Sequence, residues 1–110
     1  MGGSESKDQQ IIMKYTLVVK PSAQEDMLQA YRWYQEQRQG LGDEFLLCVE
    51  AAFSKILAFP DAYKIDYKNV HRFLTQRFPF SIFFIIEGVF IFIISVRHRR
   101  RNPDAWKSRK

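Results

Sequence analysis

The chain has 110 residues, of which 46% are hydrophobic and 15% aromatic, and it carries a formal net charge of +5. This length and composition predict one soluble-type domain with one core, and they exclude a disordered chain that cannot bury apolar surface. The single cysteine, Cys48, excludes an internal disulfide framework and a cysteine-rich metal motif. Because Cys48 falls in an apolar helical stripe, we expect it to be a small buried residue.

The positive charge is concentrated at the C-terminus. Residues 97–110 contain seven Lys or Arg and one Asp, a net +6, whereas residues 1–96 are net −1. The cluster starts at Arg97, directly after an apolar run. A turn predicted at Asn102–Asp104 and the cost of leaving Trp106 in water both favour a tail that packs back on the fold. We therefore expect the arginines to be held near the end of a strand, where they can be aimed at an acidic or polyanionic partner.

Residues 1–12 are mostly polar and contain no signal-peptide pattern. We expect them to be a disordered leader, either an engineered remnant or a native extension, followed by a single domain over 13–110 and a cytoplasmic location. The nearly apolar segment 80–96 is interrupted by Glu87 and Gly88, and it is at the short end of the roughly 17–25 residues that span a bilayer. It is better explained by two buried strands joined by a hairpin.

The first element in the chain is a short β-branched strand at Lys14–Lys20, and two helices follow it. Ser22 and Glu25 predict a capping box at the start of the first helix, which should end near Gly40. The second helix should open at Gly42 or Asp43 and end before Pro60. Apolar residues recur in both at three- and four-residue spacing: Ala23, Met27, Ala30, Tyr31 and Tyr34, then Phe45, Val49, Ala52, Phe53 and Ile56. The short link predicts an antiparallel helix hairpin.

The second half of the chain is predicted to be β-structure. Residues 61–69 are polar and irregular, Val70–Phe78 reads as a strand broken by Pro79, and Phe80–Ile86 and Val89–His98 form the hairpin. The hairpin is apolar on both faces, so helices should cover one face and a partner or the tail the other. The fold class is α+β: an N-terminal strand, an antiparallel helix hairpin, then a three-stranded antiparallel meander, with the helices packed on one sheet.

Three segments in this order resemble the RelE/ParE superfamily of type II toxin–antitoxin systems. They are Gly40–Phe45 between the helices, Arg77–Phe84 at the hairpin entry, and Val96–Trp106, which contains an H-x-x-R-x-P-x-x-W close. The resemblance covers most of residues 13–109. It implies a growth-inhibiting toxin, neutralised by a cognate antitoxin that wraps the sheet and helices. It leaves the target open, since the superfamily holds both DNA gyrase inhibitors and ribosome-dependent mRNA endonucleases, and it leaves open a homodimer or a heterotetramer with the antitoxin.

Our leading interpretation is a ParE-like, plasmid-stabilisation type of toxin that acts by binding a protein, with DNA gyrase as the target. The alternative is a RelE-like, metal-independent mRNA interferase. Its chemistry needs a base, an acid and a phosphate clamp, for which the candidates are Arg77, His98 and Arg99. Strand alternation places His98 on the opposite face from Arg97 and Arg99, and no tyrosine follows His98 as it does in several RelE-type nucleases. A third possibility is a basic accessory domain without toxicity.

Each candidate also has a structural explanation that stays open. His98 can be bonded to a backbone group, Arg77 can pair with a carboxylate, and the phenylalanines can be core residues. The candidates for target or phosphate binding are Arg72, Arg97, Arg100 and Arg101, and those for antitoxin binding are Phe83, Phe90, Phe92 and Trp106. His71, His98 and Cys48 have no metal-ligand spacing, and we expect no metal or cofactor.

Overall fold

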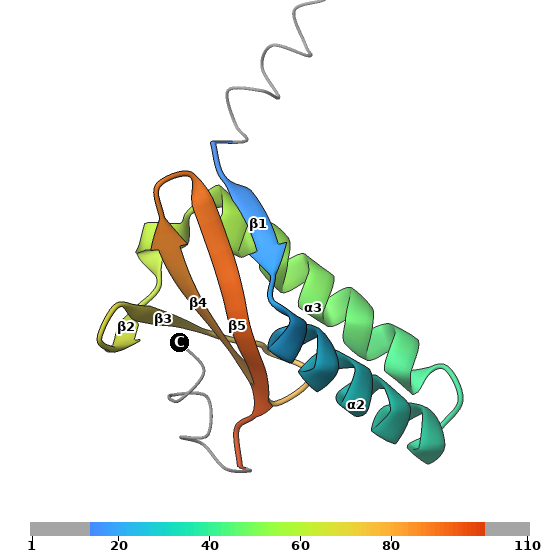
Figure 1. The fold of residues 1–110 in the computed structure, drawn as a ribbon. Coiled ribbons are helices and arrows are strands. Elements are labelled where there is room, and N and C mark those ends of the chain that lie inside the picture. Colours follow the sequence, from blue (N-terminus) through green and yellow to red (C-terminus); the bar gives the residue numbers. More distant parts are fainter. Residues whose placement is uncertain (1–13, 101–110) are drawn as a thin grey trace, which may run out of the picture.

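The computed structural model describes residues 14–100, which fold into a five-stranded sheet with two long helices on one face (Figure 1). The strand order is β1-β5-β4-β3-β2, with β1 parallel to β5 and every other neighbouring pair antiparallel. The predicted α+β class and helix hairpin are confirmed. The elements are β1 (Thr16–Val19), α2 (Pro21–Gln37), α3 (Leu41–Ala58), the 3₁₀ turn η1 (Pro60–Ala62), β2 (Ile65–Tyr67), β3 (Val70–Leu74), β4 (Phe80–Glu87) and β5 (Phe90–His98).

The predicted capping box at the start of α2 is wrong. The N-cap is Lys20, without a side-chain cap, and Pro21 occupies the first helical turn. Proline is suited to this position because its ring fixes φ and it has no N–H to satisfy. Ser22 therefore lies inside the helix, and its hydroxyl donates to the carbonyl of Ile94 on β5 at 3.1 Å. The serine joins the helix to the sheet instead of capping it.

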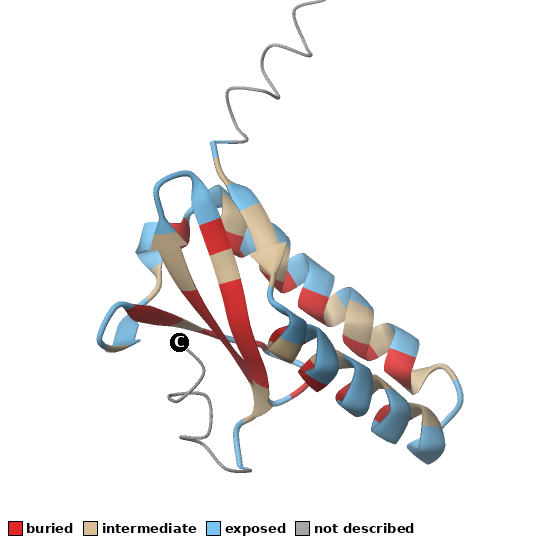
Figure 2. Cartoon of the chain, viewed as in Figure 1, coloured by how far each residue is buried: buried red, intermediate tan, exposed pale blue. Residues whose placement is uncertain are grey.

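The two helices bury the apolar stripes that their sequence periodicity predicts (Figure 2). The residues that face the sheet and are buried are Ala23, Ala30, Tyr34, Phe45, Val49, Ala52 and Ile56, while Met27, Tyr31 and Phe53 are half-buried. Cys48 is also half-buried, more exposed than we expected, and it packs against the core. Between the helices Gly40 adopts φ +90°, a left-handed conformation that favours glycine.

The β4–β5 hairpin is confirmed, and Gly88 supplies the positive φ of +61° that its turn needs. Two other details differ from the prediction. Residues 65–67, expected to be irregular, form β2 against β3, so the antiparallel part has four strands instead of three. The β3 strand ends at Leu74 instead of Phe78, because the Thr75 hydroxyl bonds the carbonyls of Phe78 and Phe80 and folds the chain into a tight connection.

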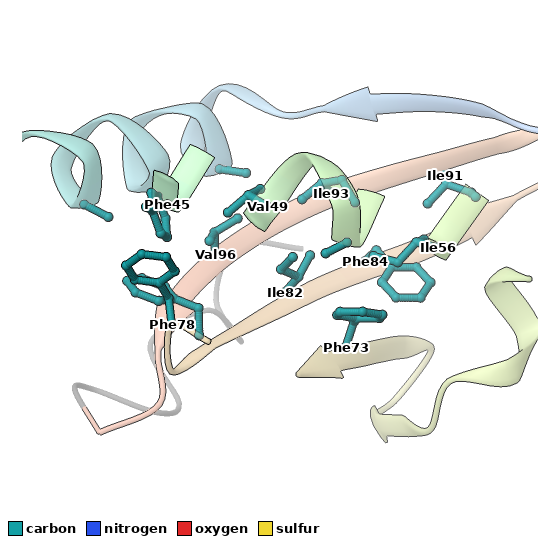
Figure 3. Packing of buried hydrophobic residues seen from close by; sticks show 14 of the residues in the cluster. Phe45, Val49, Ile56, Phe73, Phe78, Ile82, Phe84, Ile91, Ile93 and Val96 are labelled. Atoms are coloured by element: carbon teal, nitrogen blue, oxygen red, sulfur yellow. The ribbon is translucent and has the colours of Figure 1, made fainter. Parts of the chain in front are cut away.

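The main core lies between the sheet and the helices, where Phe45, Ile82 and Phe84 are completely buried (Figure 3). A second, smaller cluster of Val70, Phe83 and Ile94 lies apart from it. The pairing of β4 with β5 shifts between Phe83 and Phe84, which leaves Ile94 as the extra residue on β5. This bulge lets Ile93 and Val96 both join the main core, so the alternation of side chains changes phase just before the basic end of the strand.

Candidate functional site

Beyond the last residue pair of β1 and β5, side chains of α2 cover the edge of β5. Strand β1 pairs with β5 only as far as Val19 and Ile93. Beyond that point Asp26 takes over: its carboxylate accepts from the Ser95 hydroxyl at 3.2 Å, the Val96 N–H at 3.0 Å and the Arg97 guanidinium at 3.2 Å. Asp26 is only 8% exposed. A buried carboxylate with three donors fixes both the helix and the first arginine of the basic cluster.

An open cleft of about 410 Å³ lies beside this ion pair, between α2 and the end of β5. Its floor consists of buried apolar side chains, and its rim carries polar, aromatic and basic groups. The lining residues are Asp26, Gln29, Ala30, Trp33, Phe80, Val96, Arg97 and His98. Strand alternation predicted that Arg97 and His98 would be separated on opposite faces. Both line this cleft, because Arg97 pairs with Asp26 of the neighbouring helix while His98 lies edge-on against Phe80, with ring centroids 5.4 Å apart.

The three nuclease candidates lie where the β3–β4 connection meets the end of β5, and each is bonded to a different partner. The Arg77 guanidinium forms an ion pair with Glu44 at the start of α3. The Arg99 guanidinium donates to the Thr75 carbonyl, and its backbone N–H donates to the Pro79 carbonyl at 2.8 Å. His98 Nδ1 accepts the Arg100 N–H at 3.2 Å. The structural explanations for Arg77 and His98 therefore describe the contacts that are present.

Glu44 connects two arginines from different parts of the chain. It pairs with Arg77 from the strand connection and with Arg38 at 3.4 Å from the turn between the helices. The hydrogen bond from Arg77, assisted by the positive charges of Arg77 and Arg38, holds the pKa of Glu44 below its ordinary value of 4.5. Glu44 thereby ties the helix hairpin to the β3–β4 connection.

This ion pair predicts a dependence of stability on pH. Because the pKa of Glu44 is lowered in the folded chain, its stabilisation is complete above its ordinary value of 4.5 and is lost as pH falls through the lower folded value. The difference in unfolding free energy between the wild type and Glu44→Gln should therefore shrink as urea titrations move from neutral pH to about pH 3. The effect should weaken in salt, since the Glu44 side chain is 35% exposed. Parallel pH profiles for the two proteins would contradict this role.

The remaining candidates are dispersed. Arg72 lies on β3 and pairs with Asp66 of β2 at 3.7 Å, apart from the cleft, while Arg100 is exposed just beyond β5. Phe83 is 3% exposed, whereas Phe90 is 44% exposed and its ring stacks on the half-buried Phe92 with centroids 5.9 Å apart. Arg101, Trp106 and the predicted turn at 102–104 lie outside the described residues. Arg97 and Arg99 are nevertheless held at the end of β5, by Asp26 and by the Thr75 carbonyl, whereas the packing of the tail on the fold that the sequence predicted stays a prediction.

Asp26, Gln29, Trp33 and Glu44 were missed by sequence reasoning. The spacing of Ser22 and Asp26, one helical turn apart on the apolar side of α2, was an available signal that polar groups meet the sheet there. Within residues 14–100, no set of three His, Cys, Asp or Glu residues is placed to bind a metal ion. Neither described helix is long and apolar enough to cross a membrane.

The comparisons with known proteins agree with this architecture. A family model described as the ParE toxin of the type II toxin–antitoxin system parDE matches residues 17–103. A structure of the chromosomal ParDE TA system from P. aeruginosa has a TM-score of 0.71 at 16% identity and covers 78% of this chain and 97% of its own. A mutant of the E. coli toxin RelE in the free state has a TM-score of 0.54 at 14% identity, with coverage of 88% and 94%. No curated protein sequence matches.

A helix hairpin on a mixed five-stranded sheet is the fold that this chain shares with both solved structures. Because the family model matches most of its length, the chain belongs to the ParE toxin family of type II toxin–antitoxin systems. The two solved structures support the fold, and their low identity leaves the choice of target to the residues of this chain.

Proposed function

We propose that this toxin inhibits growth by binding a protein target, DNA gyrase, in the cytoplasm, and that it has no catalytic role there. The observation that carries the proposal is the family match over residues 17–103. The contacts of the candidate catalytic groups support it. Arg77 and Arg99, the two arginines that would have to clamp a phosphate, are bonded to Glu44 and to the Thr75 carbonyl. Each would have to exchange a protein partner for substrate, which lowers the affinity that such a clamp can provide.

We also propose that a cognate antitoxin neutralises the chain. The similar P. aeruginosa structure is that of a ParDE TA system, in which a toxin has its partner. In this chain Phe90 and the half-buried Phe92 present an aromatic strip on β5, and the Arg97–Arg100 cluster provides positive charge at the other end of the same strand. An acidic segment with apolar side chains complements both features. The predicted contact at Phe83 would require a side chain that is buried in this structure to become accessible.

The runner-up is a ribosome-dependent mRNA endonuclease. Two observations favour it over other enzyme classes: the fold similarity to RelE, and the presence of Arg77, His98 and Arg99 at one end of the sheet. In that reaction His98 would exchange a proton with the ribose or the leaving oxygen, and the arginines would stabilise the phosphorane. The Nδ1 atom of His98 accepts a backbone N–H, so in the neutral ring the proton lies on Nε2, where it could be donated.

Expression of the chain without its antitoxin tests both toxin hypotheses, the gyrase inhibitor and the mRNA endonuclease. Induction should arrest growth, and co-expression of the product of an adjacent short acidic open reading frame should restore it. Primer extension on cellular mRNA then separates the mechanisms. We expect intact mRNA with induction of the DNA-damage response, and His98→Ala should still arrest growth. Codon-phased cleavage that His98→Ala abolishes would establish the endonuclease instead, and normal growth on induction would rule out both.

A further inference from the structure

The cleft between α2 and β5 has the construction of a pocket that receives a side chain from a partner. Its floor is made of Ala30, Phe80 and Val96, all buried, and none of these side chains carries a hydrogen-bonding group. One wall is Trp33, which remains 48% exposed although an indole is expensive to leave in water. Its volume of about 410 Å³ is large enough for a leucine or aromatic side chain together with adjoining backbone. Exposed tryptophan beside an apolar floor is the composition typical of binding hot spots.

The rim of the cleft determines the charge of the expected occupant. Asp26 is the one acidic residue among the described residues that line the cleft; its charge is balanced by Arg97, and the Ser95 hydroxyl and Val96 N–H also bond it. Arg97 uses only Nη1 in this pair, and its other N–H groups have no partner among residues 14–100. The exposed Arg100 lies beside the cleft, since its backbone N–H bonds the ring of the lining residue His98, and it adds a positive charge there. Acidic side chains that flank an apolar anchor would find complementary charge here.

We propose that this cleft is an anchor site for the antitoxin, and that it takes an apolar side chain from an acidic segment of that protein. The proposal rests on the proposed function, because it assigns a surface to the partner that the function requires. It adds the α2 residues Gln29 and Trp33 to the candidate antitoxin-binding residues Phe90 and Phe92 of β5. The apolar side chains of Ala30, Phe80 and Val96 suit a leucine or aromatic side chain better than the edge of a nucleic-acid base.

A pair of substitutions at Gln29 tests the charge of the occupant. Gln29 is exposed, lines the cleft, and donates to Glu25 one helical turn earlier at 3.2 Å. Gln29→Glu and Gln29→Lys are similar in size and opposite in charge. With the purified product of the adjacent open reading frame as the ligand, Gln29→Glu should weaken binding about tenfold at low salt, while Gln29→Lys should leave it unchanged or tighter. The difference should largely disappear in about 1 M salt.

Two further variants make the test specific to the cleft. Gln37 is an exposed glutamine on the same helix that does not line the cleft, so Gln37→Glu is the matched control and should change affinity by less than about threefold. Trp33→Ala should weaken binding about tenfold or more by removing the apolar wall, and Trp33→Phe should recover most of that loss. Thermal unfolding of each variant establishes that the fold is retained.

The outcomes separate this inference from the function on which it rests. If the wild type binds the antitoxin and all Gln29 and Trp33 variants bind it within about twofold of the wild type, the anchor site is wrong and the toxin–antitoxin function stands. If the wild type neither binds the antitoxin nor is neutralised by it, both the anchor site and the toxin–antitoxin function are ruled out. If the Gln29 and Trp33 variants instead alter binding of a single-stranded RNA oligonucleotide while antitoxin affinity is unchanged, the cleft is an RNA site and the proposal is overturned.

Discussion

Replacing Asp26 with alanine should destabilise the chain by about 3–5 kcal/mol, because it removes the acceptor from a buried, charged network. The Val96 N–H and the Ser95 hydroxyl, now 3.0 and 3.2 Å from the carboxylate, would be left without that acceptor, and the Arg97 guanidinium would lose its counter-ion. Domains of this size have total stabilities of about 5–15 kcal/mol. The variant should therefore be close to unfolding, and α2 should separate from β5 first.

Urea unfolding of Asp26→Ala and Asp26→Asn measures this loss of stability and separates the contribution of the charge from that of the hydrogen-bond acceptor. Asparagine retains one oxygen acceptor but not the charge, so its cost should lie between those of wild type and alanine, at about 1–3 kcal/mol. The control is Glu50→Ala, at an exposed position of α3, which should change stability by less than about 0.5 kcal/mol. If Asp26→Ala cost no more than Glu50→Ala, the carboxylate would not be what fixes α2 to the edge of β5.

Gly42→Ala is the second substitution with a large expected effect, at about 2–3 kcal/mol of destabilisation. Two opposite effects act at this position. Alanine is favoured over glycine within a helix by about 1 kcal/mol. A Cβ at Gly42, however, would lie 2.6 Å from the Tyr31 carbonyl oxygen and 2.7 and 2.8 Å from side-chain atoms of Gln35 and Tyr31. The side chains can move, but the Tyr31 oxygen is backbone, so the two helices would have to separate.

The matched control for Gly42→Ala is Gly88→Ala at the tip of the β4–β5 hairpin. Its Cβ would meet nothing within 4 Å, so only the positive φ of +61° is penalised, at about 1 kcal/mol. In thermal unfolding, the midpoint temperature of Gly42→Ala should lie clearly below that of Gly88→Ala. Gly42→Ala should also lose the 2.7 Å hydrogen bond that the Gly42 N–H donates to the Gln35 side chain. Equal stabilities would mean that the helix contact adapts without cost.

The elements that could be predicted from sequence are those whose burial follows a period. The helix faces around Val49 and Ala30 follow three- and four-residue spacing, and the hairpin is marked by a glycine between two apolar runs. Strand β2 could not be predicted in this way. It has three exposed or half-buried residues at the edge of the sheet, and β3 determines its pairing more than its own composition does.

The candidate site was predicted only in part for a related reason. The anchoring of Arg97–Arg100 follows from their position after a buried strand. Alternation did not predict that Arg97 and His98 would line one cleft, because the ion pair that draws Arg97 toward Asp26 of α2 is a tertiary feature. The spacing of Asp26 from Ser22 places it beside the apolar stripe of α2, but this local pattern does not show which backbone and side-chain donors it would meet. Only the end of β1 at Val19, which leaves the β5 edge to α2, makes that carboxylate important.

The most direct test of the proposed mechanism is a DNA supercoiling assay with purified gyrase and this chain. The proposed mechanism predicts that the chain inhibits supercoiling, that the purified antitoxin reverses the inhibition, and that His98→Ala inhibits as strongly as the wild type, because no proton transfer is involved. Unimpaired gyrase, together with cleavage of ribosome-bound mRNA that His98→Ala abolishes, would contradict it.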